Sequence, residues 1–394
     1  MKILHIVSSY WPAFEFGGPI QSVHILNKFL IKKGIDITVY TTNAGLRNKD
    51  IVVKKQVDLD GVKVFYFPYF GYVHFTFSLS LFWAIKKNIK NFDLIHITGV
   101  WNFPVFAAAF WARFYKKPYI ISPRGSLMKE PLVKKKSFLK KILLFLTIKK
   151  FFEKATAIHF TVEAEKEEYL KAGLNFKQAF IIPNSLHLEE FKKFNWDVGE
   201  FRKKFKIAID AKIILSLGRI NWKKGFDTLI PAFAEIIKKE PKAVLLIVGP
   251  DNESYKKEIE LEIKKQNLKI GKNIIFTEEL INDEKITAYK TANVFVLPSY
   301  SENFGMAVAE AMYMNLPVVI TENVGISSFV SRVKAGFVVK KDERQISEAI
   351  LKILNNPNLA KEMGKVGRQT VEKEFSSSEI AEKFIKEYYG IINI

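Results

Sequence analysis

A basic loop with a glycine at each end, residues 218–225, is the strongest candidate for chemistry in this sequence. It reads Gly-Arg-Ile-Asn-Trp-Lys-Lys-Gly, and it follows an apolar run over Ile213–Leu217. Ligands bind beyond the carboxyl ends of strands in open parallel sheets, and the guanidinium of Arg219 offers bidentate bonds to phosphate oxygens. With the ammonium of Lys224 it could hold a diphosphate without a metal ion. The alternative is a solvated basic turn, the commoner role of a charged loop.

Two glutamates eight positions apart follow a second apolar run, Val294–Leu297. After Asn303-Phe304-Gly305 the chain becomes apolar, which predicts a helix beginning near Gly305 whose free amides and dipole favour phosphate. Glu302 would lie in the loop before it and accept hydrogen bonds from sugar hydroxyls. Glu310 would lie among apolar neighbours, where its carboxylate needs donors such as a ribose diol. Alternatively, the helix dipole favours Glu302 and Glu310 is solvated.

Two weaker candidates lie in the first half of the chain. Gly17-Gly18 stands between a predicted strand over Ile3–Val7 and a predicted helix over Ile20–Lys33. Paired glycines let the backbone approach a ligand closely, although such a pair before a helix is commonly only a turn. His96 ends another predicted strand and is a further active-site candidate, whereas strand histidines such as His5 are more commonly core residues.

The composition excludes several kinds of site. The 394 residues contain no cysteine, which excludes disulfides, thiolate nucleophiles and thiolate metal sites. The six histidines show no ligand spacing, and the sequence has no Walker A loop, GxGxxG fingerprint, GxSxG elbow or HExxH motif. We therefore expect no metal and no cofactor.

Short apolar runs alternate with helical stretches along the chain, which is typical of parallel βαβ units. The strands predicted in the first half are Ile3–Val7, Ile35–Tyr40, Leu94–Ile97, Tyr119–Ile121, Ala157–Thr161 and Phe180–Ile182. Those in the second half are Ile213–Leu217, Val244–Val248, Ile274–Phe276, Val294–Leu297 and Val318–Ile320. The predicted helices include Ile20–Lys33, ended by Gly34, Glu163–Ala172, ended by Gly173, and Phe226–Lys239.

The length and this pattern predict two α/β domains, because one core rarely grows so large. A polar stretch over 195–210 without a clear strand predicts a linker. We expect an N-terminal domain over residues 1–196 and a C-terminal domain over residues 197–375. A final helix is predicted over 376–394, with Ser376 and Glu379 at capping-box spacing.

Positive charge is concentrated in the first half of the chain. The net charge is +20, and residues 1–200 hold 30 basic and 16 acidic side chains. Eight lysines in Pro131–Ala155 are interleaved with apolar residues in an imperfectly amphipathic pattern. Such a helix could bind anionic headgroups at about 1 kcal/mol per basic residue, or it could be a core helix with a solvated side. The lysines expected to bind the membrane are Lys134, Lys135, Lys136, Lys140, Lys141, Lys149 and Lys150.

The N-terminal run Ile3–Val7 is too short for a secretion signal, and no stretch reaches the roughly 18 uninterrupted apolar residues that a spanning helix needs. We therefore expect a cytoplasmic protein that associates peripherally with the inner face of the cell membrane.

Together these motifs resemble the retaining glycosyltransferases of family 4, which have the GT-B fold. The match covers essentially the whole chain, through Gly17-Gly18, Ile182-Pro183-Asn184, the 218–225 loop and Gly249, and is most specific over 294–305. The resemblance implies two Rossmann-like domains facing each other across a deep cleft. It also implies that the C-terminal half binds a nucleotide sugar, that the N-terminal half receives the acceptor, and that the last helix crosses back to the first domain.

The resemblance also implies roles for individual residues. Arg219 and Lys224 would contact the diphosphate, and Glu310 the ribose. Glu302 would act at the donor sugar. The further donor-binding positions are Gly17, Gly18, Gly249, Glu279, Leu280, Asn303, Phe304 and Gly305. Where many relatives carry a histidine after an N-terminal-domain strand, this sequence has Arg124, so an acid–base role there is open and phosphate or an acidic acceptor is its expected ligand.

These implications predict a metal-independent hexosyl transferase that moves a sugar from a UDP- or GDP-linked donor to a glycan or lipid-linked acceptor with retention. Its expected setting is cell-envelope polysaccharide or lipopolysaccharide synthesis. One alternative is a nucleotide-sugar epimerase of the same fold. The other is a basic nucleic-acid-binding protein, but the sequence holds no recognised nucleic-acid module, so no such partner is expected.

Overall fold

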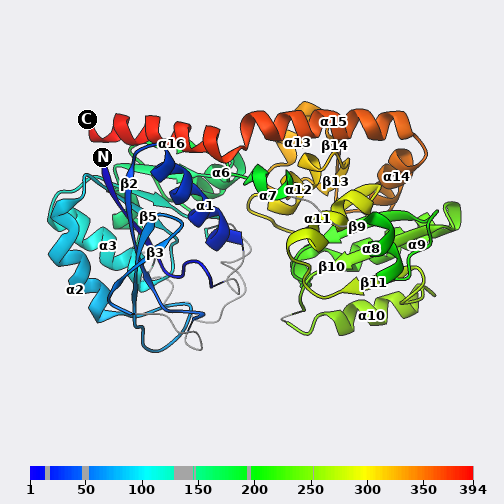
Figure 1. Ribbon diagram of the computed structural model, residues 1–394, viewed down its shortest axis with the longest axis horizontal. Helices are drawn as coiled ribbons and strands as arrows, with labels where there is room; N and C mark the ends of the chain where they lie inside the picture. Colours follow the sequence, from blue (N-terminus) through cyan, green and yellow to red (C-terminus); the bar gives the residue numbers. More distant parts are fainter. Residues whose placement is uncertain are drawn as a thin grey trace. The chain divides into compact units, whose positions relative to one another are not determined.

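The computed structural model describes the chain except residues 14–17, 47–52, 128–144, 146–147, 193–196, 252 and 394, and the side chain of Pro19. The chain forms two compact units (Figure 1). Unit 1 comprises Met1–Ser185 and Ser377–Ile394, and unit 2 comprises Leu186–Ser376. Leu186 belongs to unit 2 because its N–H donates to the carbonyl of Phe375 at 2.8 Å. The division therefore falls ahead of the boundary expected at 196.

The described residues of unit 1 form an eight-stranded sheet in the order β3-β4-β2-β1-β5-β6-β7-β8. Its strands are β1 (Lys2–Val7), β2 (Asp36–Thr42), β3 (Gln56–Leu59), β4 (Val62–Phe67), β5 (Leu94–Thr98), β6 (Tyr119–Ser122), β7 (Ala157–Phe160) and β8 (Ala179–Ile181). Neighbouring strands are parallel except β3 and β4. Buried strands of a parallel sheet are covered on both faces, which explains the continuous apolar runs of the sequence.

Helices cover the two faces of this sheet. They are α1 (Gly18–Lys32), α2 (Leu79–Asn88), the 3₁₀ turn η2 (Ile89–Asn91), α3 (Phe103–Phe114), α6 (Glu163–Lys171) and α16 (Ser377–Ile392). One apolar core joins the sheet to α2 and α3, and another joins it to α1 and α16. The last helix thus runs beside α1 (Figure 1). Gly34 and Gly173 have φ angles of 85° and 74°, which confirms the predicted helix ends.

Unit 2 contains, within its described residues, a six-stranded parallel sheet in the order β11-β10-β9-β12-β13-β14. Its strands are β9 (Lys212–Leu217), β10 (Ala243–Val248), β11 (Ile274–Thr277), β12 (Val294–Leu297), β13 (Val318–Thr321) and β14 (Gly336–Val339). Its helices are α7 (Leu188–Lys192), α8 (Val198–Lys204), η3 (Trp222–Lys224), α9 (Phe226–Lys239), α10 (Lys256–Lys265), α11 (Asn282–Thr291), α12 (Met306–Tyr313), α13 (Ser327–Val333), α14 (Glu343–Leu354) and α15 (Pro357–Glu374).

Residues 195–210, the expected linker, include α8. The carboxylate of Asp197 caps this helix by accepting from the N–H groups of Gly199 and Glu200 at 2.6 and 3.0 Å. Phe201 of the helix is fully buried. Residues 197–204 are therefore a packed element of unit 2, although they contain no strand.

Within the part of the chain that the structure describes, no helix is both long enough and apolar enough to cross a membrane. Most of the lysine-rich Pro131–Ala155 stretch lies outside the described residues, although residues 148–153 are helical. Of its expected membrane-binding lysines, Lys149 lies 3.7 Å from Glu153, and Lys150 is exposed.

A directional hydrogen-bond chain crosses the buried centre of unit 1. His159 Nε2 lies 2.8 Å from the carbonyl of Ile182, which can only accept, so this nitrogen carries the proton. With a neutral ring, His159 Nδ1 accepts from the hydroxyl of Ser122 at 2.7 Å. Ser122 Oγ in turn accepts from Nε2–H of His96, and Nδ1 of His96 accepts from the hydroxyl of Tyr388 on α16, both at 2.7 Å. One carbonyl thereby sets the direction of the whole chain.

His5 of β1 adds a third buried ring, stacked on His96 with ring centroids 4.3 Å apart. Its two nitrogens bond with Asn27 Oδ1 at 2.8 Å and Thr98 Oγ1 at 2.9 Å. Burial lowers the pKa of His5 to about 4, and it holds the pKa values of His96 and His159 well below their ordinary value. All three rings are therefore neutral in the folded protein at neutral pH.

This cluster predicts acid sensitivity. The unfolded chain takes up protons at these rings near pH 6.5 while the folded chain does not, so stability is complete above that pH and falls as the pH falls. Below pH 6.5, we expect each histidine to lower the free energy of unfolding by about 1.4 kcal/mol per pH unit. The three together should lower it by about 4 kcal/mol per pH unit. Urea unfolding at a series of pH values from neutral down to His5's folded pKa of about 4 measures this slope.

Two substitutions test whether the buried histidines cause this slope. His5→Gln is expected to remove one histidine's share of it, whereas His74→Gln, at an exposed position, should leave it unchanged. An identical slope in His5→Gln and the native chain would contradict the assignment.

Candidate functional site

The loops that follow β9, β10 and β12 pack backbone against backbone at the carboxyl edge of the sheet in unit 2. Gly225 has a φ of 73°, and a Cβ added there would lie 2.0 Å from the carbonyl oxygen of Pro298. A Cβ added at Gly249, whose φ is 143°, would lie 2.1 Å from the carbonyl oxygen of Gly218. Only glycine fits such approaches. The chain order of the sheet reverses between β9 and β12, which is where open α/β sheets bind ligands.

An ion pair joins two of these loops. Lys224 Nζ lies 2.6 Å from Glu302 Oε2, with 16% and 28% of their side chains exposed. The N–H of Tyr300 also donates to the carbonyl of Lys223 at 2.8 Å. Lys224 is therefore held in place, and the alternative of a freely solvated basic turn does not describe it.

Glu302 lies in a segment whose backbone is held by hydrogen bonds on both of its sides. Its N–H donates to the carbonyl of Asn323 at 3.1 Å, and its own carbonyl accepts from Gly325 at 2.9 Å. The carbonyl of Phe304, whose ring is buried, accepts from Ile326 at 3.1 Å. These bonds tie residues 302–304 to the loop after β13.

Helix α12 begins directly after Gly305, which confirms the predicted start. Gly305 has a φ of 95°, and a Cβ there would lie 2.9 Å from a methyl group of Val324. The first turn of α12 carries no acidic side chain, and the first amides of a helix have no carbonyl one turn earlier. Beside Glu302, the structure therefore offers N–H donors and the positive end of a helix dipole.

Glu310 is buried on α12, so the alternative of a solvated side chain is wrong. Its carboxylate accepts hydrogen bonds from Lys285 Nζ and from the hydroxyl of Tyr289, both at 2.7 Å. Both donors lie on α11. Burial and the charge of Glu310 raise the pKa of Tyr289. The sequence left the donors of Glu310 open and identified neither partner.

Arg219 differs from these paired charges. It is exposed, and no described residue accepts a hydrogen bond from its side chain. Lys224 and Lys285 are each matched by a carboxylate, so Arg219 supplies uncompensated positive charge to the same loops. Such a site suits an anion.

A second cluster beside the loops joins Tyr300, of the 294–305 stretch, to Asp227 and Lys341, which the sequence did not single out. Tyr300 donates its hydroxyl to Asp227, and Lys341 Nζ lies 3.8 Å from the centre of the Tyr300 ring. Lys341 also lies 3.9 Å from Asp227. This cluster fixes the Tyr300 ring just ahead of Glu302.

The expected base-contacting residues lie farther along the same sheet edge. Glu279 and Leu280 follow β11, which β10 separates from β9. Glu279 is exposed and Leu280 is buried. Their contact with a base stays a prediction.

In unit 1, Arg124 follows β6 in a left-handed conformation, with a φ of 53°. Its Nη1 donates to Asn184, while its buried Nε has no partner among the described residues. Burial lowers the pKa of Arg124 to about 10. The next residue, Gly125, donates its N–H to Glu165 at 2.5 Å.

Glu165 is a buried carboxylate that the sequence did not identify. It accepts from the N–H and hydroxyl of Thr161 at 2.7 and 2.8 Å, in addition to Gly125. Three donors on two strand ends therefore fix the turn that carries Arg124. In the sequence, Glu165 appears only as a glutamate on the first turn of a predicted helix. Solvated glutamates are common at that position, so the pattern does not indicate a buried one.

The other candidates of unit 1 have different surroundings. His96 is fully buried, and both of its ring nitrogens are bonded within the protein. Gly18 begins α1, with open space around the position of a Cβ. Gly17 lies outside the described residues, as do Lys134, Lys135, Lys136, Lys140 and Lys141.

The chain matches two family models, one in each half. Residues 16–190 match the model described as Glycosyltransferase Family 4, and residues 197–370 match the model described as Glycosyl transferases group 1.

Similar proteins are found among curated sequences. The capsular polysaccharide biosynthesis glycosyltransferase CapM of Staphylococcus aureus is 32% identical over 51% of this chain and 54% of its own length. The putative teichuronic acid biosynthesis glycosyltransferase TuaC of Bacillus subtilis is 24% identical over 99% of both chains. For CapM and several other curated relatives, the match spans about half of their length.

Among solved structures, Alr3699/HepE of Anabaena in complex with UDP-glucose superimposes with a TM-score of 0.77, 16% identity and coverage of 99% of this chain and 100% of the other. The fold is therefore the expected GT-B fold, with a parallel sheet in unit 2 and a largely parallel one in unit 1, each packed against helices.

Gly225 allows a sharp test of the loop packing. Gly225→Ala adds a Cβ into the carbonyl of Pro298 and also strains the backbone, so we expect a loss of more than about 2 kcal/mol of stability. Gly271→Ala is the matched control, because its φ of 81° brings the same strain into open space, and it should cost about 1 kcal/mol. Thermal unfolding measures both, and equal losses would refute the packing argument.

Proposed function

The chain belongs to the glycosyltransferases of family 4, and on that premise we propose that it transfers a hexose from a nucleoside-diphosphate donor to a glycan or lipid-linked acceptor, with retention. The observation that carries this proposal is the convergence, at the point where the strand order of unit 2 reverses, of unpaired Arg219, the Lys224–Glu302 pair and the first amides of α12. These groups suit a diphosphate joined to a sugar.

In the proposed reaction, the bond between the anomeric carbon and the terminal donor phosphate breaks, and the acceptor oxygen bonds to that carbon. Negative charge then collects on the departing diphosphate. Arg219, Lys224 and the amides of α12 would stabilise that charge, which is the largest contribution expected from a preorganised site. The leaving phosphate would assist loss of the acceptor's hydroxyl proton. No metal ion or cofactor is needed in this scheme.

Glu302 and Glu310 would hold the two ends of the donor. Glu302 is fixed by Lys224 and by its backbone bonds, and its carboxylate would accept hydrogen bonds from sugar hydroxyls. Glu310 already receives Lys285 and Tyr289, but a carboxylate offers about four acceptor positions. A ribose hydroxyl would take a remaining one. Gly249, Asn303 and Phe304 would shape the loops around the diphosphate, and Glu279 and Leu280 would meet the base.

Unit 1 would receive the acceptor. Arg124 has a buried Nε without a partner among the described residues, and its turn is fixed by Glu165. Its guanidinium would bind a phosphate or an acidic group of the acceptor. Gly17 and Gly18 would approach the donor phosphates.

The proposed setting is the cytoplasm, at the inner face of the cell membrane, in cell-envelope polysaccharide or lipopolysaccharide synthesis. Relatives named for capsular polysaccharide and teichuronic acid biosynthesis support the envelope setting. The UDP-glucose complex of the Anabaena protein favours a UDP-linked sugar, with a GDP-linked sugar as the other candidate. The lysines of Pro131–Ala155 would attract anionic lipid.

Nucleotide release from a panel of UDP- and GDP-sugars tests the reaction. Arg219→Ala is expected to lower kcat/KM by about 100-fold, because one donor to the developing charge is lost. Arg344→Ala is the matched control, since Arg344 is an exposed arginine of unit 2 that pairs with Glu348, and it should stay within about twofold of the native rate.

Unchanged turnover in Arg219→Ala would show that the diphosphate binds elsewhere. Conversion of the donor sugar in the absence of any acceptor would instead favour an epimerase.

A further inference from the structure

Helices α2 and α3 of unit 1 expose large aromatic side chains. Trp83 of α2 is 55% exposed and Phe114 of α3 is 65% exposed, and Phe106 and Phe110 are also exposed. The three phenylalanines lie on successive turns of α3, and the rings of Phe106 and Phe110 stack with centroids 6.4 Å apart. Contiguous exposed aromatics of this kind mark an interaction surface. We call these four residues, with Lys86, Lys87 and Lys90, the α2–α3 face.

The charged side chains of the α2–α3 face are all positive. No acidic residue occurs in α2, η2 or α3, and residues 61–129 contain nine basic side chains against one acidic, Asp93. Asp93 accepts from the N–H of Lys2 at 2.7 Å. Among the described residues, no carboxylate lies within ion-pair distance of Lys86, Lys87 or Lys90. The partner of this face must therefore carry the negative charge.

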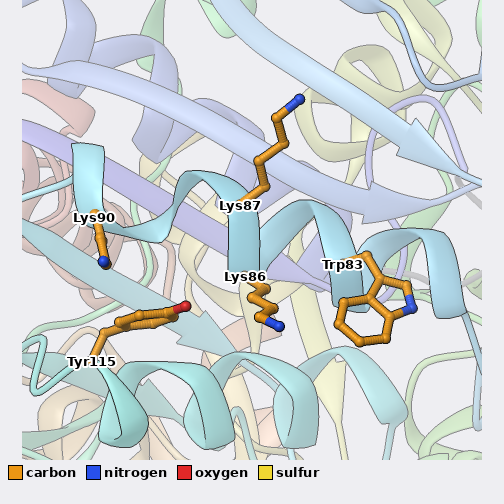
Figure 2. Close-up of a pocket in the computed structure, with 5 residues that line it drawn as sticks. All are labelled: Trp83, Lys86, Lys87, Lys90 and Tyr115. Carbon is orange, nitrogen blue, oxygen red and sulfur yellow. The ribbon is translucent and has the colours of Figure 1, made fainter.

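A hollow of about 380 Å³ lies on this face, lined by Trp83, Lys86, Lys87, Lys90 and Tyr115 (Figure 2). Figure 2 shows Lys86 and Lys90 extending toward the helix that ends beside Tyr115, while Lys87 extends away from it. Lys86 Nζ lies 4.9 Å from the Trp83 ring, and Lys90 Nζ lies 4.8 Å from the Tyr115 ring. Each of these two ammonium groups thus lies beside an aromatic ring that lines the hollow.

Trp111 adds an unused donor beside the hollow. It is 94% buried, since 6% of its surface is exposed, and its indole N–H has no hydrogen-bond partner among the described residues. Its ring centroid lies 6.5 Å from that of Trp83 and 5.9 Å from that of Tyr115, and Lys86 Nζ is 5.3 Å away. Buried donors without a partner are uncommon, and this one lies in the layer of rings directly beneath the hollow.

The helix dipole offers a simpler reason for part of this pattern. Lys86 and Lys87 lie in the last turn of α2, where cations are stabilised by the helix dipole. That effect explains neither the exposed rings of α3 nor the unpartnered N–H of Trp111. The surface of an anionic bilayer explains both the exposed rings and the unpaired lysines, because aromatic rings favour the headgroup region and lipid phosphates supply negative charge.

We propose that the α2–α3 face binds anionic phospholipid at a bilayer surface, with a lipid phosphate in the hollow beside Lys86 and Lys90. This inference deepens the membrane association proposed above and rests on it only for the setting. It differs in the residues that carry it, because none of the seven residues that define this face belongs to the lysine-rich stretch Pro131–Ala155, whose Phe151 packs against Phe106.

Co-sedimentation of the full chain with vesicles tests the charge requirement. We expect binding to vesicles of phosphatidylcholine with phosphatidylglycerol, and little binding to phosphatidylcholine alone. Lys86→Gln/Lys87→Gln/Lys90→Gln is expected to weaken binding by about 100-fold, since three charges leave the surface. The matched control is Lys264→Gln/Lys361→Gln/Lys365→Gln, which removes three exposed lysines of unit 2 and should bind within about twofold of the native chain.

Tryptophan quenching tests the contact itself. Anionic vesicles with brominated acyl chains should quench the fluorescence of the native chain. Trp83→Phe should keep vesicle binding and lose most of the quenching, because it removes the exposed indole and keeps an aromatic ring. Unchanged quenching in Trp83→Phe, or equal vesicle binding by the two lysine triples, would overturn the inference.

Two further outcomes separate this inference from the proposed function. If neutralising Lys149 and Lys150 together with the lysines of 134–141 abolishes vesicle binding while the Lys86 triple does not, membrane association stands and this face is not part of it. If the native chain is a dimer that Trp83→Phe dissociates, with vesicle binding unchanged, the occupant is a second copy and the inference is wrong. Donor turnover with a soluble acceptor should be the same in every surface variant, so its loss would instead bear on the catalytic proposal.

Discussion

The site of unit 2 depends on one constraint, the near-contact of backbones in the loops after β9, β10 and β12. At Gly225 and Gly249 the neighbouring carbonyl occupies the space of a Cβ, so these loops lie closer together than side chains would permit. This proximity lets Lys224 reach Glu302 across two loops and places both next to the start of α12. The glycines therefore contribute no chemistry of their own, yet they set the distances between the groups that do.

The polar groups near the sheet are charged in unit 2 and mostly neutral in unit 1. In unit 2, charges gather at the sheet edge, where two carboxylates are each matched by a lysine and Arg219 is left uncompensated. In unit 1, the polar groups nearest the sheet centre are neutral rings and hydroxyls bonded to one another. Pairing accounts for the difference, because the buried Glu310 has a lysine beside it, whereas the buried rings of unit 1 have no counter-charge and are stable as a neutral chain of matched donors and acceptors. His96 is thereby explained as part of the interior, and Arg124 is left as the cation at that edge.

Local patterns in the sequence were enough to place most strands, the helix ends at Gly34 and Gly173, and the start of α12 at Gly305. Groups that meet only through the fold were not visible. Lys285 and Tyr289 stand more than twenty positions before Glu310, and Glu165 meets Gly125 across forty, so no spacing rule joins them. Strand β3 was missed because it is an edge strand with alternate residues exposed, and β4 because its buried residues alternate with half-buried ones, so neither gives a continuous apolar run. Helix α8 was missed because Phe201 is the one buried residue among its seven, which gives no repeating apolar pattern.

The hydrogen-bond chain from Tyr388 to Ile182 has a consequence for the order in which the protein is made. Its first donor lies on α16, which is synthesised only after all of unit 2, although it completes the core of unit 1. During translation, unit 2 can acquire all of its strands while unit 1 still lacks the helix that covers one face of its sheet. Until α16 leaves the ribosome, apolar residues such as Ile3 and Val39 remain without part of their cover. The unit encoded later can thus fold first, and a ribosome that stops before α16 is complete leaves unit 1 unfinished, although that unit was begun first.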